Sequence, residues 1–103
     1  MSYQVVLQLP GDSLANYLGM IVLEIRLTRA LGDLADVDGH DFGKGERNIF
    51  IITDEPQEAF RQARPVLERG GYLSSLRAAY RHADRDDYIV IWPEHFIGEF
   101  TMS

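Results

Sequence analysis

The chain has 103 residues, 46% of them hydrophobic, which is enough for one domain with a core and too few for two. It contains no cysteine, which excludes disulfide frameworks, thiolate metal sites and cysteine nucleophiles. Its formal net charge of −6 repels phosphate backbones and argues against nucleic-acid binding. We therefore expect a single acidic domain over residues 1–103.

The composition also bears on location. The first ten residues lack the basic region and the long apolar core of a signal peptide, and no apolar run reaches membrane-spanning length. Together with the absence of cysteine, this predicts a cytoplasmic protein that has no membrane partner.

The first two elements are a strand and a long helix. Residues 3–9 alternate in the period of a half-buried strand. The short polar side chain of Asp12 or Ser13 can cap a following helix. We expect that helix to run to Leu31 and to end at Gly32, a residue typical of helix C-termini.

Two apolar stripes run along this helix on roughly opposite sides. A helix that only covers a sheet needs one apolar stripe, and we expect the first to take this role. The second stripe therefore predicts contact with a partner subunit or with another element of the chain. Residues 20–27 have an alternative interpretation as a strand, because several of them are β-branched. We prefer the helix because good helix formers flank this segment. The first stripe consists of Leu14, Leu18, Ile21 and Ile25, and the second of Met20, Leu23, Leu27 and Leu31.

A β-hairpin follows the helix. Residues 34–40 and 48–53 are predicted to be strands, and the sequence Gly-Lys-Gly-Glu at 43–46 forms the turn between them. Glycine supplies the positive φ that such a turn needs.

The remaining elements are a second helix, a short helix and a last strand. Thr53 or Asp54 caps the second helix, which Pro65 should kink or divide. Residues 73–80 are predicted to form a short helix and residues 88–92 the last strand.

The resulting element order is β-α-β-β-α-β, with an extra short helix before the last strand. We therefore predict an α+β fold of the ferredoxin-like type with a four-stranded antiparallel sheet. Two helices cover one face of such a sheet, whereas the last two strands are apolar on both faces. We expect a second copy of the chain, or the tail at residues 95–100, to cover part of the remaining face. We favour a homodimer.

Acidic side chains surround the hairpin and raise the possibility of a hard-metal site. The spacing of a calcium loop is absent, because aligning Gly39 with its glycine places Leu34 and Gly45 at two ligand positions. We expect a charged edge strand and predict no bound metal or cofactor. The cluster comprises Asp33, Asp36, Asp38, His40, Asp41 and Glu46.

Catalytic motifs are not recognisable either. The turn at 43–45 joins two strands rather than leading into a helix, so it does not fit a phosphate-binding loop. Neither Ser13 nor the serine pair at 74–75 has the setting of an activated nucleophile. We therefore assign no catalytic residue.

The hairpin resembles small bacterial domains of similar length to which no activity is assigned. The resemblance rests on Val37-Asp38-Gly39-His40-Asp41, on the sequence from Gly43 to Ile51, on Thr53-Asp54 with Pro56, and on residues 88–93. It implies a stand-alone bacterial α/β module and transfers no functional residue.

Two functions compete at this point. The first is a non-enzymatic protein-interaction module, one form of which is a toxin-neutralising immunity protein. The second is a small ligand-binding domain or cofactor-free enzyme with an apolar pocket between sheet and helices. The candidate ligand-binding residues for this second function are Tyr17, His40, Asn48, Tyr88 and Trp92.

Overall fold

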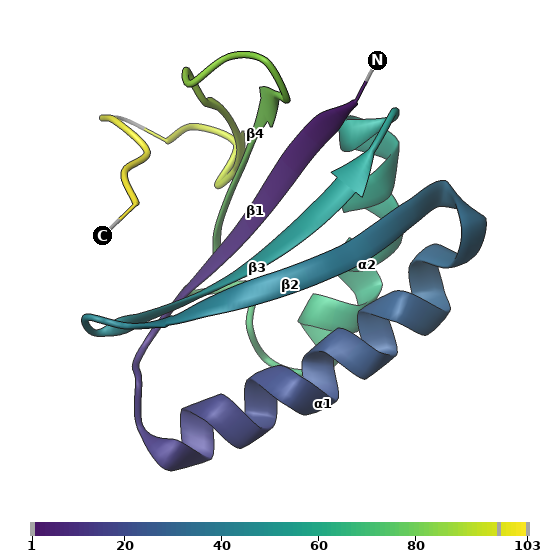
Figure 1. The fold of residues 1–103 in the computed structure, drawn as a ribbon. Helices are drawn as coiled ribbons and strands as arrows, with labels where there is room; N and C mark the ends of the chain where they lie inside the picture. The colour runs from purple at the N-terminus through teal and green to yellow at the C-terminus, as the bar shows by residue number, and fades with distance from the viewer. Residues whose placement is uncertain (1, 97, 103) are drawn as a thin grey trace.

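A computed structural model of the chain describes residues 2–96 and 98–102. These residues form two α-helices, a 3₁₀ turn and one five-stranded antiparallel sheet of order β2-β3-β1-β4-β5. Figure 1 shows both helices on the same side of the sheet. The elements are β1 (Tyr3–Pro10), α1 (Leu14–Leu31), the 3₁₀ turn (Gly32–Leu34), β2 (Ala35–Gly43), β3 (Glu46–Thr53), α2 (Pro56–Arg69), β4 (Arg77–His82) and β5 (Ile89–Trp92).

The prediction of a four-stranded ferredoxin-like sheet is wrong, because the sheet has five strands. The error lies in residues 73–80, where we predicted a short helix and the structure has β4. Good helix formers occupy this segment, but so short a helix gains little from propensity alone. Pairing with β1 decides the outcome, and Ala78 and Ala79 become fully buried on opposite faces of the sheet. The predicted last strand becomes β5 at the edge.

β1 lies at the centre of the sheet. It pairs with β3 on one side and with β4 on the other, so that Val5 lies opposite both Ile51 and Tyr80. Val5, Val6 and Leu7 are all fully buried, which requires that both faces of the sheet be covered.

α1 is a continuous helix, so the alternative interpretation of residues 20–27 as a strand is wrong. Of the two predicted caps, Ser13 is the one that caps it: its hydroxyl accepts a hydrogen bond from the Asn16 amide at 3.1 Å. The stripe that faces the sheet, however, is the second one, from Met20 to Leu31. The first stripe, which we expected to cover the sheet, points away from it.

Polar contacts at the start of α1 link it to the tip of the hairpin. The Arg47 guanidinium donates hydrogen bonds to the Pro10 carbonyl at 2.8 Å and to the Asn16 carbonyl at 3.2 Å. The Asp12 carboxylate accepts a hydrogen bond from the Gly45 amide at 2.9 Å. These contacts hold the first turn of α1 and favour the observed rotation of the helix about its axis.

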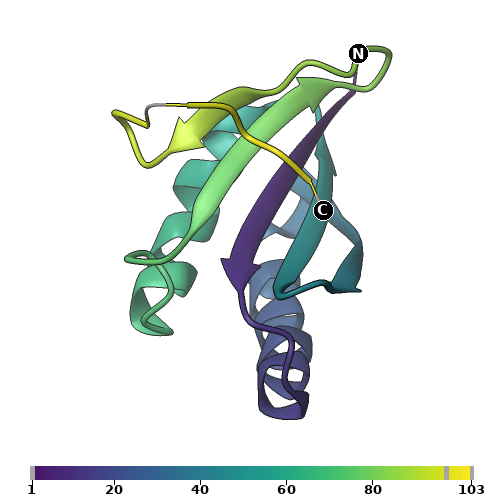
Figure 2. The same ribbon diagram turned by 90° about the vertical axis from the view of Figure 1, so that its left-hand side faces the viewer.

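The C-terminal tail covers part of the other face of the sheet. Phe100 is buried there against Val6 and Ala79. The Gln8 side-chain amide donates a hydrogen bond to the Thr101 carbonyl at 3.0 Å. Figure 2 shows the tail, coloured yellow, crossing the sheet on the side opposite the helices. This part of the face is therefore covered within the chain.

α2 runs from Pro56 to Arg69 without division, although it contains Pro65. The prediction that Thr53 or Asp54 caps this helix is wrong, because the N-cap residue is Glu55 and no side chain caps it. The Thr53 hydroxyl instead accepts a hydrogen bond from the Glu55 amide at 3.0 Å, just before the helix begins. The buried side of α2 completes the core between helices and sheet.

Candidate functional site

The structure brings together two of the five predicted ligand-binding residues. Tyr17 on α1 and His40 on β2 meet edge to face, with ring centroids 5.8 Å apart. The ring of Phe42 also packs on Tyr17, with ring centroids 5.1 Å apart. Asn48, Tyr88 and Trp92 have different neighbours.

Glu24 completes the cluster at His40. Its carboxylate oxygen Oε1 lies 3.0 Å from Nδ1 of His40. A carboxylate in this position holds the Nδ1–H tautomer of the neutral ring and leaves Nε2 as an acceptor. Such a histidine can accept a proton from a bound molecule. Sequence reasoning missed Glu24, because its pairing with His40 across sixteen residues depends on how α1 packs on β2.

We expect neutral His40 to carry its proton on Nδ1 and Glu24→Ala to shift it toward Nε2, because the substitution removes the acceptor. Long-range ¹⁵N–¹H correlation spectra of the imidazole distinguish the two tautomers. His95 is an exposed histidine in the same chain and provides an internal control. A His40 tautomer that does not respond to the loss of Glu24 would contradict the pairing.

The other three predicted residues make contacts that stabilise the fold. The Trp92 indole donates a hydrogen bond to the Leu73 carbonyl at 3.0 Å, and its ring lies 4.5 Å from the Arg64 guanidinium. The ring centroids of Tyr88 and Phe100 are 5.0 Å apart, so Tyr88 helps to hold the tail. Asn48 is buried in β3, between the strand partners Gln8 and Asp41. A shared pocket for all five residues is therefore not formed.

The glycine-rich hairpin tip has a structural explanation. Lys44 and Gly45 both have positive φ, 57° and 80°, as a tight turn requires. The Gly45 amide, which would be available to an anion in a phosphate loop, already donates to Asp12.

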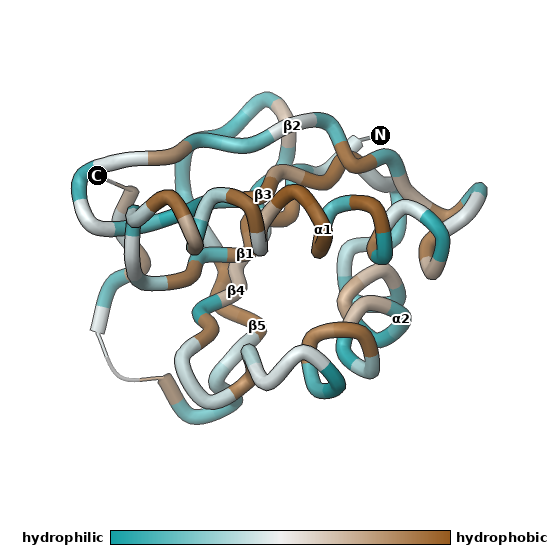
Figure 3. Tube along the Cα trace, turned by 90° about the horizontal axis from the view of Figure 1, so that it is seen from below, coloured by the Kyte–Doolittle hydropathy of each residue, from teal (hydrophilic) through white to brown (hydrophobic). Residues whose placement is uncertain are grey.

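An exposed aliphatic row runs along the side of α1 that points away from the sheet. It contains the first predicted stripe and one more residue, and Figure 3 shows hydrophobic positions recurring along α1. Leu14 is 75% exposed and Leu18 is 56% exposed. Contiguous apolar surface of this kind marks interaction sites more often than isolated apolar residues do. We call this row the outer stripe; it consists of the exposed Leu14, Leu18, Val22 and Ile25 and the half-buried Ile21.

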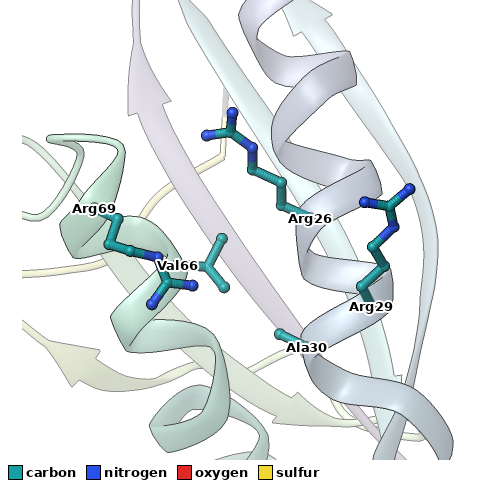
Figure 4. Close-up of a pocket in the computed structure, with 5 residues that line it drawn as sticks. All are labelled: Arg26, Arg29, Ala30, Val66 and Arg69. Carbon is teal, nitrogen blue, oxygen red and sulfur yellow. The ribbon is translucent and has the colours of Figure 1, made fainter.

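A basic hollow lies between α1 and α2. It has a volume of about 470 Å³ and an apolar floor that includes Val66. Figure 4 shows Arg26 and Arg69 approaching the gap from the two helices, with Arg29 on the outer side of α1. We call this hollow the arginine groove; its lining residues are Arg26, Arg29, Ala30, Val66 and Arg69.

The acidic residues do not assemble a metal centre. Within residues 2–96 and 98–102, no group of three or more histidine or carboxylate side chains is placed to hold an ion.

In the exposed turn after β4, the Arg85 guanidinium donates to the Asp87 carboxylate at 3.2 Å and lowers the pKa of that carboxyl below its ordinary value.

Neither helix in the described part of the chain is long and apolar enough to cross a membrane. Comparisons with protein-family models, with curated proteins and with solved structures find no match to the chain. The candidate sites therefore rest on the geometry of the chain's own side chains.

Proposed function

We propose that this protein is a non-enzymatic protein-interaction module that forms a homodimer through the outer stripe of α1. The observation that carries the proposal is an exposed aliphatic row on a helix whose opposite side already fills the core. Burying such a row against a second copy removes apolar surface from water.

The spacing of the outer stripe fits pairing between two copies of α1. Leu14, Leu18, Ile21 and Ile25 follow one another at intervals of four, three and four residues, as in the seam of a coiled coil. If two antiparallel copies cross between residues 19 and 20, Leu14 faces Ile25 of the second copy and Leu18 faces Ile21. Every apolar side chain of the seam then meets another.

Charge supports the antiparallel arrangement. The last turns of α1 carry Arg26 and Arg29, and Asp12 precedes its first turn. Antiparallel pairing brings the basic end of each helix toward Asp12 of the other copy, whereas parallel pairing places like charges side by side. The charges of β2 make pairing through this edge strand a poorer alternative.

The expected affinity is modest. With 18 residues, α1 is about 27 Å long, so one helix pair buries on the order of several hundred Å² per chain. Interfaces at this end of the size range are weak. We therefore expect micromolar dissociation, visible over a broad range of chain concentration.

Sedimentation equilibrium tests the dimer. We expect the wild-type chain to be dimeric at high micromolar concentration, and Leu18→Glu to be monomeric because pairing would bury a charge in each copy. The matched control is Ile89→Glu, since Ile89 is also aliphatic and 53% exposed but lies on β5. A monomeric wild-type chain, or equal dissociation of both variants, would overturn the proposal. Circular dichroism verifies that both variants are folded.

A different protein partner, such as the toxin that an immunity protein binds, stays a prediction beyond the homodimer.

A second candidate function, a small ligand-binding domain or cofactor-free enzyme, is supported by the Glu24–His40 pair beside Tyr17. It is tested by a fragment screen that monitors the ring signals of these residues. A saturable shift that His40→Phe abolishes would favour it, and no response would count against it.

A further inference from the structure

We propose that the arginine groove binds the phosphate group of a small phosphate monoester and places its organic part over Ala30 and Val66. The groove lies between α1 and α2, whereas the outer stripe points away from the core. Arg26 and Arg29 also belong to the basic end of α1 in the proposed dimer, so the ligand is titrated at chain concentrations where the dimer is dissociated. The proposed site rests on the arginine side chains that line the groove and on the observation that these side chains have no polar partner.

The three arginines of the groove differ from the rest. Within the described part of the chain, the side chains of Arg26, Arg29 and Arg69 make no hydrogen bond or ion pair, although acidic side chains outnumber basic ones. Each remaining arginine has a polar, ionic or aromatic partner. These are Arg47, Arg61, Arg64, Arg77, Arg81 and Arg85.

Placing the unpaired positive charges of Arg26 and Arg69 at one gap is unfavourable without an anion. Arg29 and Arg69 each lie in the last turn of a helix, where a cation interacts favourably with the helix dipole. That effect accounts for these two positions. It does not account for Arg26, nor for the approach of Arg26 and Arg69 to the same gap in Figure 4.

The shape of the groove selects the class of ligand. Guanidinium groups bind phosphate through paired hydrogen bonds. A volume of about 470 Å³ exceeds what a bare phosphate needs and lies within the range of roughly 300–1,000 Å³ for small-molecule sites. The apolar floor at Val66 and Ala30 suits an organic group attached to the phosphate. A nucleic-acid chain would extend over a surface of net negative charge and is disfavoured.

Titrations with phenyl phosphate, inorganic phosphate and succinate, followed by amide chemical shifts at low ionic strength, test the site. We expect saturable binding of one phenyl phosphate per chain, with shifts at Ala30 and Val66. Inorganic phosphate should bind more weakly because it lacks the group that covers the floor, and salt should weaken both. Binding that does not saturate, or succinate binding as tightly as phenyl phosphate, would overturn the assignment.

Charge-matched variants separate the groove from the overall field. Arg26→Gln and Arg69→Gln should each weaken phenyl phosphate binding about tenfold or more, because each removes a charged hydrogen-bond donor. Arg85→Gln changes the net charge by the same amount at an exposed turn and should alter binding less than twofold. Equal weakening in all three variants would mean that only bulk charge attracts the ligand. All three positions are exposed, so folding should be retained.

Discussion

Leu27→Ala is expected to lower the free energy of unfolding by about 2–5 kcal/mol, the range for truncating a buried leucine. Leu27 is fully buried in the core, on the stripe of α1 that includes Met20 and Leu31. Truncation leaves a cavity that α1 cannot close without shifting on the sheet, so the cost exceeds the lost transfer free energy. Urea denaturation followed by circular dichroism measures the difference.

Leu14→Ala is the matched control on the same helix. Leu14 is 75% exposed, and the substitution should change stability by no more than about 0.5 kcal/mol. Both variants must be compared at chain concentrations where the dimer is dissociated, because dimerisation itself stabilises the folded chain. Equal losses in the two variants would mean that α1 does not face the sheet with the stripe from Met20 to Leu31.

α1 illustrates which structural features the local sequence determines. The start of α1 at a Ser13 cap and its end at Gly32 follow from local chemistry within one turn. The end was predicted, and Ser13 was one of the two predicted caps. Which stripe faces the sheet was predicted wrongly, because both stripes have aliphatic residues at helical spacing. Local sequence does not include the contacts of Arg47 and Asp12 with distant backbone groups, which form only when the hairpin packs beside the helix.

The fold was missed for a similar reason. Residues 77–82 become a strand because β1 is apolar on both faces and pairs on both sides. Nothing in the local composition of that segment signals this. In the candidate site, Tyr17 and His40 were predicted individually, but Glu24 and the arginine groove depend on how α1 lies against β2 and α2.

Phe100→Ala is expected to lower the free energy of unfolding by roughly 3 kcal/mol, near the lower end for removing a buried phenylalanine. Phe100 is 9% exposed and covers Val6 and Ala79 on the face of the sheet opposite the helices. Its loss should also release the hydrogen bond from Gln8 to Thr101 and speed amide exchange in β4. Glu99→Ala, at an exposed neighbour, should leave stability and exchange unchanged.

Phe100→Ala also distinguishes two surfaces on which a second copy of the chain could bind. With Phe100 in place, the chain covers Val6 and Ala79 itself, and most of the large hydrophobic side chains that stay exposed in the described residues lie on the outer stripe of α1. We therefore expect Phe100→Ala to add a new, weaker self-association that Leu18→Glu does not abolish, because the uncovered face lies on the other side of the molecule. Unchanged stability in Phe100→Ala would mean that the tail does not hold this face. The sheet, rather than α1, would then become the better candidate for the dimer interface.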